Sequence, residues 1–410
     1  MLKNNLKFLR NKIPKSRRVK YLPVLLSVSM LLLLGGLVVY LLPQLENRPH
    51  VQKNNPEAKA HIISAMSKCY QLRGQNNCYK NAAQDAVRLF SVDDITRTIG
   101  ESESTLEIYS ECHTFMHFVG QEEYKRVKNL GQALSEGSFV CFEGYQHGVV
   151  EGYFVDQNIS IEAGSAALEK EIQNVCGKQD DYDKPELFSQ CLHGIGHAAM
   201  FLTQNEVPMS LELCDMLQSD TKEEYCYSGV FMENSNSSTN KDHPSKYVDR
   251  NNPLYPCTIL GERYLKMCYE MQSFKFFEYS GQDWPKTIAL CDRIPREYQS
   301  GCFRTIGSTQ VGFTQDFSGM KAVCDLIKNS ASRALCLKSI VTTLSTRFGG
   351  DVQRMSRFCN IVDPDFKNTC YSQIGLSLKQ WIRDPEQINS LCQQILEEEY
   401  KKVCENPQNI

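Results

Sequence analysis

Apolar residues recur at helical spacing along most of the chain, and residues 351–381 show the pattern clearly. Residues 352–362 carry apolar side chains three or four positions apart. An Asp-Pro-Asp turn at 363–365 follows, with proline where a new helix can begin, and residues 366–381 form a second amphipathic series. This segment therefore predicts a hairpin of two helices, which we call helix A and helix B.

The cysteines indicate that this hairpin is repeated. All 18 cysteines fall into nine successive close pairs, and the first members of the last six pairs recur at steps of 43, 34, 33, 35 and 33 residues. A period of about 34 residues is typical of stacked helical hairpins. The expected pairs are Cys69–Cys78, Cys112–Cys141, Cys176–Cys191, Cys214–Cys226, Cys257–Cys268, Cys291–Cys302, Cys324–Cys336, Cys359–Cys370 and Cys392–Cys404.

We therefore expect an all-α, right-handed helical-hairpin repeat solenoid. In each unit one cysteine lies late in helix A and the other in the early turns of helix B, so a disulfide would staple the hairpin. Each such bond adds about 2–3 kcal/mol for a loop of this length. The period matches that of tetratricopeptide repeats, and the cysteine-stapled plan is similar to that of secreted Sel1-like repeat proteins. The similarity is one of architecture, because the residue signatures of both families are absent.

The N-terminal residues predict a membrane anchor. Residues 1–20 carry eight basic side chains and no acidic one, and residues 21–42 carry no charge, which is the length that a helix needs to cross a bilayer. Basic flanks stay in the cytoplasm, so residues 1–20 form a cytoplasmic tail and the bulk of the chain lies outside. The even cysteine count also favours an oxidising, extracytoplasmic compartment. A cleaved signal peptide is the alternative, but no small-residue cleavage site follows. Residues 43–60 predict a short stalk.

The charge balance narrows the choice of partners. The net charge is −3, and the part beyond the basic tail carries about −11. An acidic domain without a basic stripe is a poor nucleic-acid binder. Residues 61–256 form the histidine-bearing repeats and residues 257–410 the C-terminal repeats, which offer a surface for a protein or peptide partner. A polar insertion at 234–256 accounts for the 43-residue step, and it is either a lid or a disordered loop.

The histidines point to a metal site. Five of the eight histidines lie between residues 113 and 197, in three groups that each follow a cysteine closely: Cys112, Cys141 or Cys191. They occur four positions apart, or four positions from a glutamate, so each pair shares one face of its helix. Stacked B helices would bring these faces to one inner wall. The candidate ligands are His113, His117, Glu143, His147, His193 and His197, with Glu151 and Glu233 as candidate general bases.

Imidazoles with carboxylates suit a divalent Zn, Fe, Mn or Cu ion, and a haem held by two histidines is a second option. Alternatively, the histidines are buried side chains that bond neighbouring helices. Glycines at positions 120, 144, 148, 152, 194 and 196 predict either close helix packing or room for a ligand. Signatures of zinc proteases, serine hydrolases and nucleotide-binding loops are absent. The sequence thus predicts a membrane-anchored metalloprotein, either a hydrolase or an oxidoreductase, or else a non-catalytic extracytoplasmic scaffold.

Overall fold

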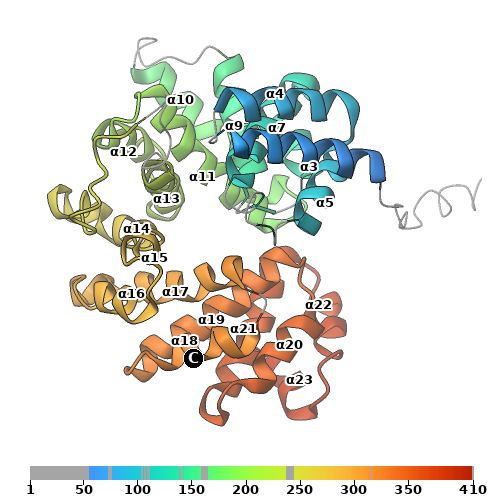
Figure 1. Ribbon diagram of the computed structural model, residues 1–410, viewed down its shortest axis with the longest axis vertical. Coiled ribbons are helices and arrows are strands. Elements are labelled where there is room, and N and C mark those ends of the chain that lie inside the picture. Colours follow the sequence, from blue (N-terminus) through green and yellow to red (C-terminus); the bar gives the residue numbers. More distant parts are fainter. Residues whose placement is uncertain are drawn as a thin grey trace, which may run out of the picture. The chain divides into compact units, whose positions relative to one another are not determined.

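The computed structural model describes residues 55–410, apart from residues 73–75, 103–104, 106–107, 109–110, 138–139, 142, 158–164, 237–243, 315 and 409–410. The described residues contain helices and no strand, which confirms the all-α prediction (Figure 1). Residues 55–410 form one compact unit, and the division at 256/257 into histidine-bearing and C-terminal repeats stays a prediction.

The α-helices follow one another along the chain, and some of the connections contain 3₁₀ turns (Gln179–Asp181, Cys257–Ile259 and Arg296–Tyr298). Their bounds are α3 (Pro56–Gln71), α4 (Asn76–Leu89), α5 (Val92–Ser102), α7 (Cys112–Val127), α8 (Leu130–Glu136), α9 (Gly144–Asp156), α10 (Ser165–Asn174), α11 (Pro185–Leu202), α12 (Val207–Asp215), α13 (Asp220–Asn236), α14 (Glu262–Ser273), α15 (Phe276–Tyr279), α16 (Trp284–Cys291), α17 (Gln299–Phe313), α18 (Phe317–Asp325), α19 (Ser330–Arg347), α20 (Val352–Ile361), α21 (Pro364–Trp381), α22 (Pro385–Cys392) and α23 (Glu398–Glu405).

One helix of each hairpin packs against its counterpart in the next hairpin. These helices form an unbroken row, which we call the inner row: α4, α7, α9, α11, α13, α14, α17, α19, α21 and α23 (Figure 1). The shorter helices α8, α12, α16, α18, α20 and α22 pack on members of this row. This arrangement agrees with the predicted stack of B helices, whereas its right-handed sense stays a prediction.

The nine disulfides pair the cysteines as the spacing predicts and use all 18 of them. Seven bonds close a hairpin of two α-helices, as Cys359 of α20 and Cys370 of α21 do, whereas Cys257–Cys268 joins a 3₁₀ turn to α14. The bond between Cys112 and Cys141 is different, because Cys112 is the first residue of α7 and Cys141 lies just before α9. It therefore joins two consecutive members of the inner row, with α8 between them, and the hairpin prediction is wrong for this pair.

The predicted stalk overlaps the first described helix. Pro56 opens α3, and the side chain of Asn55 caps the helix by accepting the N–H of Ala58 at 3.2 Å. Proline suits a first helical position because its fixed φ is helical and its missing N–H is not needed there. The basic tail at 1–20, the anchor at 21–42 and most of the stalk lie outside the described residues. Among the described helices, none combines the length and apolarity needed to span a bilayer.

The described part of the polar insertion is attached to the helices beside it. Asn234 lies in α13, and its side chain donates to the carbonyl oxygen of Tyr247 at 3.0 Å and accepts the hydroxyl of Ser245 at 2.6 Å. The hydroxyl of Tyr247 in turn donates to Glu206 at 3.0 Å. Residues 234–236 thus belong to α13, and residues 245–247 are held against Asn234 near its C-terminal end.

Glycines bring the inner helices into backbone contact. A Cβ atom at Gly148 of α9 would collide with the carbonyl oxygen of His117, and one at Gly229 of α13 would collide with that of His193. In the opposite direction, Gly120 faces the backbone of Tyr145. Of the two interpretations left open by the sequence, close helix packing is therefore correct at these positions.

We expect Gly148→Ala to lower the free energy of unfolding by about 1–3 kcal/mol, because the added methyl group pushes α7 and α9 apart. Urea unfolding with the disulfides intact, followed by circular dichroism, measures this change. Gly131→Ala in α8 is the matched control, since a Cβ there meets only the Asn129 side chain at 3.8 Å. Equal stability of Gly148→Ala and the wild type would contradict the packing described.

Candidate metal centre

Five imidazoles lie together on three consecutive members of the inner row. The ring centroids of His113 and His117 on α7 are 4.6 Å apart, and those of His193 and His197 on α11 are 5.0 Å apart. His147 of α9 lies 4.4 Å from His197 and 5.4 Å from His117. Donor atoms of four residues all lie within 4.8 Å of one another: His113, His117, His147 and His197.

The two histidines of α7 turn their Nε2 atoms toward each other. Nδ1 of His113 lies 2.8 Å from the carbonyl oxygen of Cys141, which accepts its proton. Nδ1 of His117 lies 3.0 Å from Oε1 of Glu151. With both Nδ1 atoms engaged as donors, the two Nε2 atoms face each other across 3.0 Å. A ring N–H bonded to a carbonyl or carboxylate is the usual support of a metal-ligating histidine.

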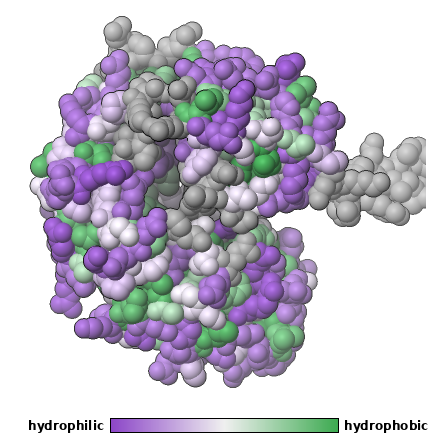
Figure 2. Space-filling view, in the orientation of Figure 1, coloured by the Kyte–Doolittle hydropathy of each residue, from purple (hydrophilic) through white to green (hydrophobic). Residues whose placement is uncertain are grey.

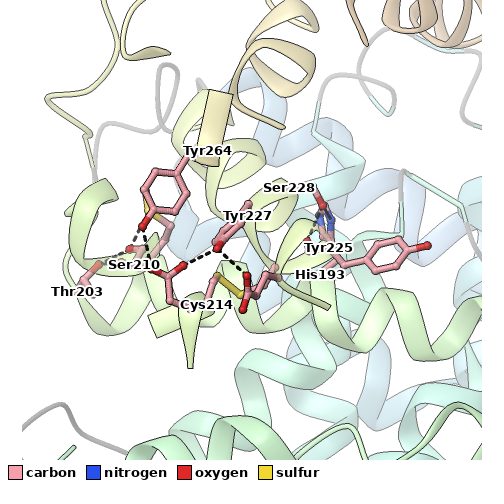
Figure 3. The surroundings of a disulfide bond; sticks show 12 residues. His193, Thr203, Ser210, Cys214, Tyr225, Tyr227, Ser228 and Tyr264 are labelled. Atoms are coloured by element: carbon pink, nitrogen blue, oxygen red, sulfur yellow. Dashed lines mark hydrogen bonds between the residues drawn. A yellow bond between two sulfur atoms is a disulfide. The ribbon is translucent and has the colours of Figure 1, made fainter. Parts of the chain in front are cut away.

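The two histidines of α11 repeat this arrangement. Nδ1 of His197 lies 2.9 Å from Oε2 of Glu233. Nδ1 of His193 lies 2.6 Å from the hydroxyl of Ser228 (Figure 3). The hydroxyl of Ser228 donates to the carbonyl oxygen of Tyr225 at 2.6 Å, so it accepts the proton of His193. The Nε2 atoms of His193 and His197 lie 3.1 Å apart.

Such close nitrogen atoms need a proton or a cation between them. Removal from water, together with a smaller effect of neighbouring imidazoles, lowers the pKa of His113 and of His193 to about 3. Burial opposes a charge on His117 too, but Glu151 outweighs that effect and raises its pKa. A proton on His117 can therefore form a hydrogen bond between the two Nε2 atoms of the α7 histidines. In the α11 pair, by contrast, burial pushes the pKa of His197 as well far below its usual value. The α11 pair thus presents two lone pairs to each other.

The spacing of the nitrogen atoms suits a metal ion. Zinc–nitrogen bonds of about 2.0–2.1 Å in tetrahedral geometry hold neighbouring nitrogens about 3.3 Å apart. His147 adds a further donor, because its Nε2 lies 3.3 Å from Oε1 of Gln190 while its buried Nδ1 has no hydrogen-bond partner in the described part of the chain. Its ring stacks on those of both α11 histidines.

The carboxylates of Glu151 and Glu233 lie behind the imidazoles. With His197 they form a second group whose donor atoms lie within 4.8 Å of one another. Oε2 of Glu151 accepts the amide of Gln121 at 2.8 Å. Removal from water raises the pKa of Glu233 to about 7, with His117 opposing the rise and Glu151 adding to it.

Glu143 does not join the converging donor atoms. It is the N-cap of α9 and has a left-handed backbone with φ of 59°. Glu143 was a candidate because it lies four positions before His147, yet only residues inside a helix follow its periodicity. His193 contacts His147 and His197 but lies outside the group of four donors.

The roles of several residues of the centre were not predicted from the sequence. Ser228, Gln121 and Gln190 are polar residues that hold imidazoles or carboxylates, and Lys275 adds a positive charge that acts on His113. Gln121 was detectable as the residue one turn after His117. The carbonyl of Cys141 could not be found, because every residue carries this group.

A polar network fixes the helix that supplies Ser228 and Glu233. The hydroxyl of Tyr227 on α13 donates to Asp215 of α12 and also lies 3.2 Å from a carboxylate oxygen of Glu223. The hydroxyl of Tyr264 on α14 donates to Asp215 at 2.8 Å (Figure 3). The disulfide between Cys214 and Cys226 lies beside this network. The network and the disulfide together set the position of α13 against α12 and α14.

Comparison with known proteins gives no further guide. No family model matches the chain, and searches of curated proteins and of solved structures found no match.

The metal-free protein should lose stability as the pH falls from about 6.5. His113 and His193 take up protons near pH 6.5 when unfolded but only near pH 3 when folded. The unfolded state therefore binds more protons in this interval, and the free energy of unfolding falls on acidification. Urea midpoints at pH 7.5 and 5.5 after chelation test this, with His113→Ala/His193→Ala as the variant that should lose less stability. An equal loss in both proteins would contradict the expectation.

Proposed function

We propose that this chain is a membrane-anchored, extracytoplasmic metalloprotein that binds a divalent transition metal in its histidine cluster. The observation that carries the proposal is the approach of four donor atoms to within 4.8 Å of one another. The bonds from ring Nδ1 atoms to Cys141, Glu151 and Glu233 support it, because they leave Nε2 available to an ion. The compartment is inferred from the N-terminal charge pattern and the nine disulfides.

The donor set narrows the choice of metal. Imidazoles suit Zn, Cu and Fe, and Mn also accepts the nearby carboxylates, whereas Ca and Mg prefer sites made of oxygen atoms. Thiolate ligands are excluded because every cysteine is in a disulfide. A haem held by two histidines needs a porphyrin between their rings, and here the rings contact one another directly. We therefore favour an ion over a haem.

The arrangement favours metal binding or redox chemistry over hydrolysis. A hydrolytic metal site retains an open coordination position and a base beside it. Here the two candidate bases, Glu151 and Glu233, each accept a ring N–H from a candidate ligand. Both carboxylates therefore orient ligands and supply negative charge beside the ion, and their role as general bases stays a prediction.

The alternative of a scaffold with a protein or peptide partner on residues 257–410 also stays a prediction. On the face shown in Figure 2, hydrophobic residues are scattered among hydrophilic ones, so this view offers no single apolar docking patch.

The purified full-length chain should contain at least one equivalent of transition metal by elemental analysis. His117→Ala/His197→Ala removes one imidazole from each helix pair and should abolish this binding while helix content and disulfides are retained. His61→Ala on α3 is the control, since His61 is exposed and lies outside the cluster. A wild-type protein that stays metal-free after exposure to Zn²⁺, Cu²⁺, Fe²⁺ and Mn²⁺ would refute the proposal.

Loss of a supporting carboxylate should weaken the site without removing a ligand. Glu233→Gln is expected to lower metal affinity about 10–100-fold, since an amide orients and polarises His197 less well. Competition with a chromophoric chelator measures the affinity. Glu224→Gln on the same helix is the matched control, because Glu224 pairs with Lys266 on the surface. Unchanged affinity in Glu233→Gln would exclude the supporting role.

A further inference from the structure

The centre is built twice from the same parts. We call His113 and His117 the α7 clamp, and His193 and His197 the α11 clamp. Each clamp is an i, i+4 pair whose Nε2 atoms lie 3.0 or 3.1 Å apart. In each, the first Nδ1 is bonded to a neutral oxygen acceptor and the second to a glutamate.

The helix contacts behind the clamps are duplicated as well. A glycine of α9, Gly148, lies against the carbonyl of a histidine in the α7 clamp, and Gly229 of α13 lies against that of His193 in the α11 clamp. Gly120 and Gly196 face the neighbouring backbone in the opposite direction. Helices α7 and α9 thus form one module, and α11 and α13 form a second.

One ion cannot use all the donors. Five imidazoles and two carboxylates meet here, whereas a tetrahedral ion takes four ligands. The group of four donors omits His193, which is 8% exposed. With its Nδ1 proton held by Ser228, the Nε2 lone pair of His193 would remain buried opposite that of His197.

We propose that the centre is dinuclear, with one first-row transition-metal ion in each clamp and His147 between them. This inference rests on the function proposed above. The ring centroids of His117 and His197 are 5.1 Å apart, which is compatible with the ion separation of about 3.5–4 Å found in two-metal sites. His147 contacts rings of both clamps. Each clamp also has its own carboxylate, which places a negative group beside each ion.

Titration of the chelated full-length chain with Zn²⁺, followed by native mass spectrometry, tests the proposal. The wild type should bind two Zn²⁺ ions, and His193→Ala should bind one. His61→Ala, outside both clamps, should retain two. One ion in the wild type that persists in His193→Ala would overturn the dinuclear centre and leave the proposed function standing. No bound ion in the wild type would overturn both.

A second variant tests the proposal even if His193→Ala fails to fold. Ser228→Ala removes the acceptor of His193 and keeps every ligand. It should therefore lower the affinity for one of the two Zn²⁺ ions about 10–100-fold and leave the affinity for the other unchanged. Electron paramagnetic resonance with Cu²⁺ provides an independent readout. Two adjacent ions in the wild type should give a spin-coupled spectrum. An isolated-ion spectrum at full wild-type occupancy would contradict the proposal.

Discussion

The approach of successive inner helices to backbone contact is the constraint on which the rest of the structure depends. At Gly148 and Gly229 the added volume of even one methyl group would meet a carbonyl oxygen of a candidate ligand. Because the helices are this close, side chains as short as histidine reach from three helices to one point. The same contacts let Glu151 and Glu233 reach imidazoles on the preceding helix.

The disulfides complement this packing. A single hairpin has little core of its own, and each bond ties a short outer element to the inner row or, at Cys112 and Cys141, ties two inner elements together. Covalent closure of short loops stabilises a fold chiefly by restricting its unfolded chain. The array can therefore hold a polar, imidazole-rich centre in its interior, where an apolar core would otherwise supply stability.

The sequence predicts more of the scaffold than of the centre. Cysteine spacing was sufficient for the pairing and for the stack of hairpins, since both follow from a fixed period. The four-residue spacing between Glu143 and His147 did not place Glu143 beside the other donors, because Glu143 is the N-cap of α9 and does not lie within the helix. The roles of Ser228 and the Cys141 carbonyl depend on contacts between helices, and no local pattern specifies them.

Anomalous diffraction at the zinc edge, from crystals of the protein grown with Zn²⁺, tests the central claim most directly. We predict a strong peak within bonding distance of Nε2 atoms contributed by both α7 and α11. Crystals in which these imidazoles hydrogen-bond only to one another, with zinc bound solely elsewhere on the surface, would contradict it.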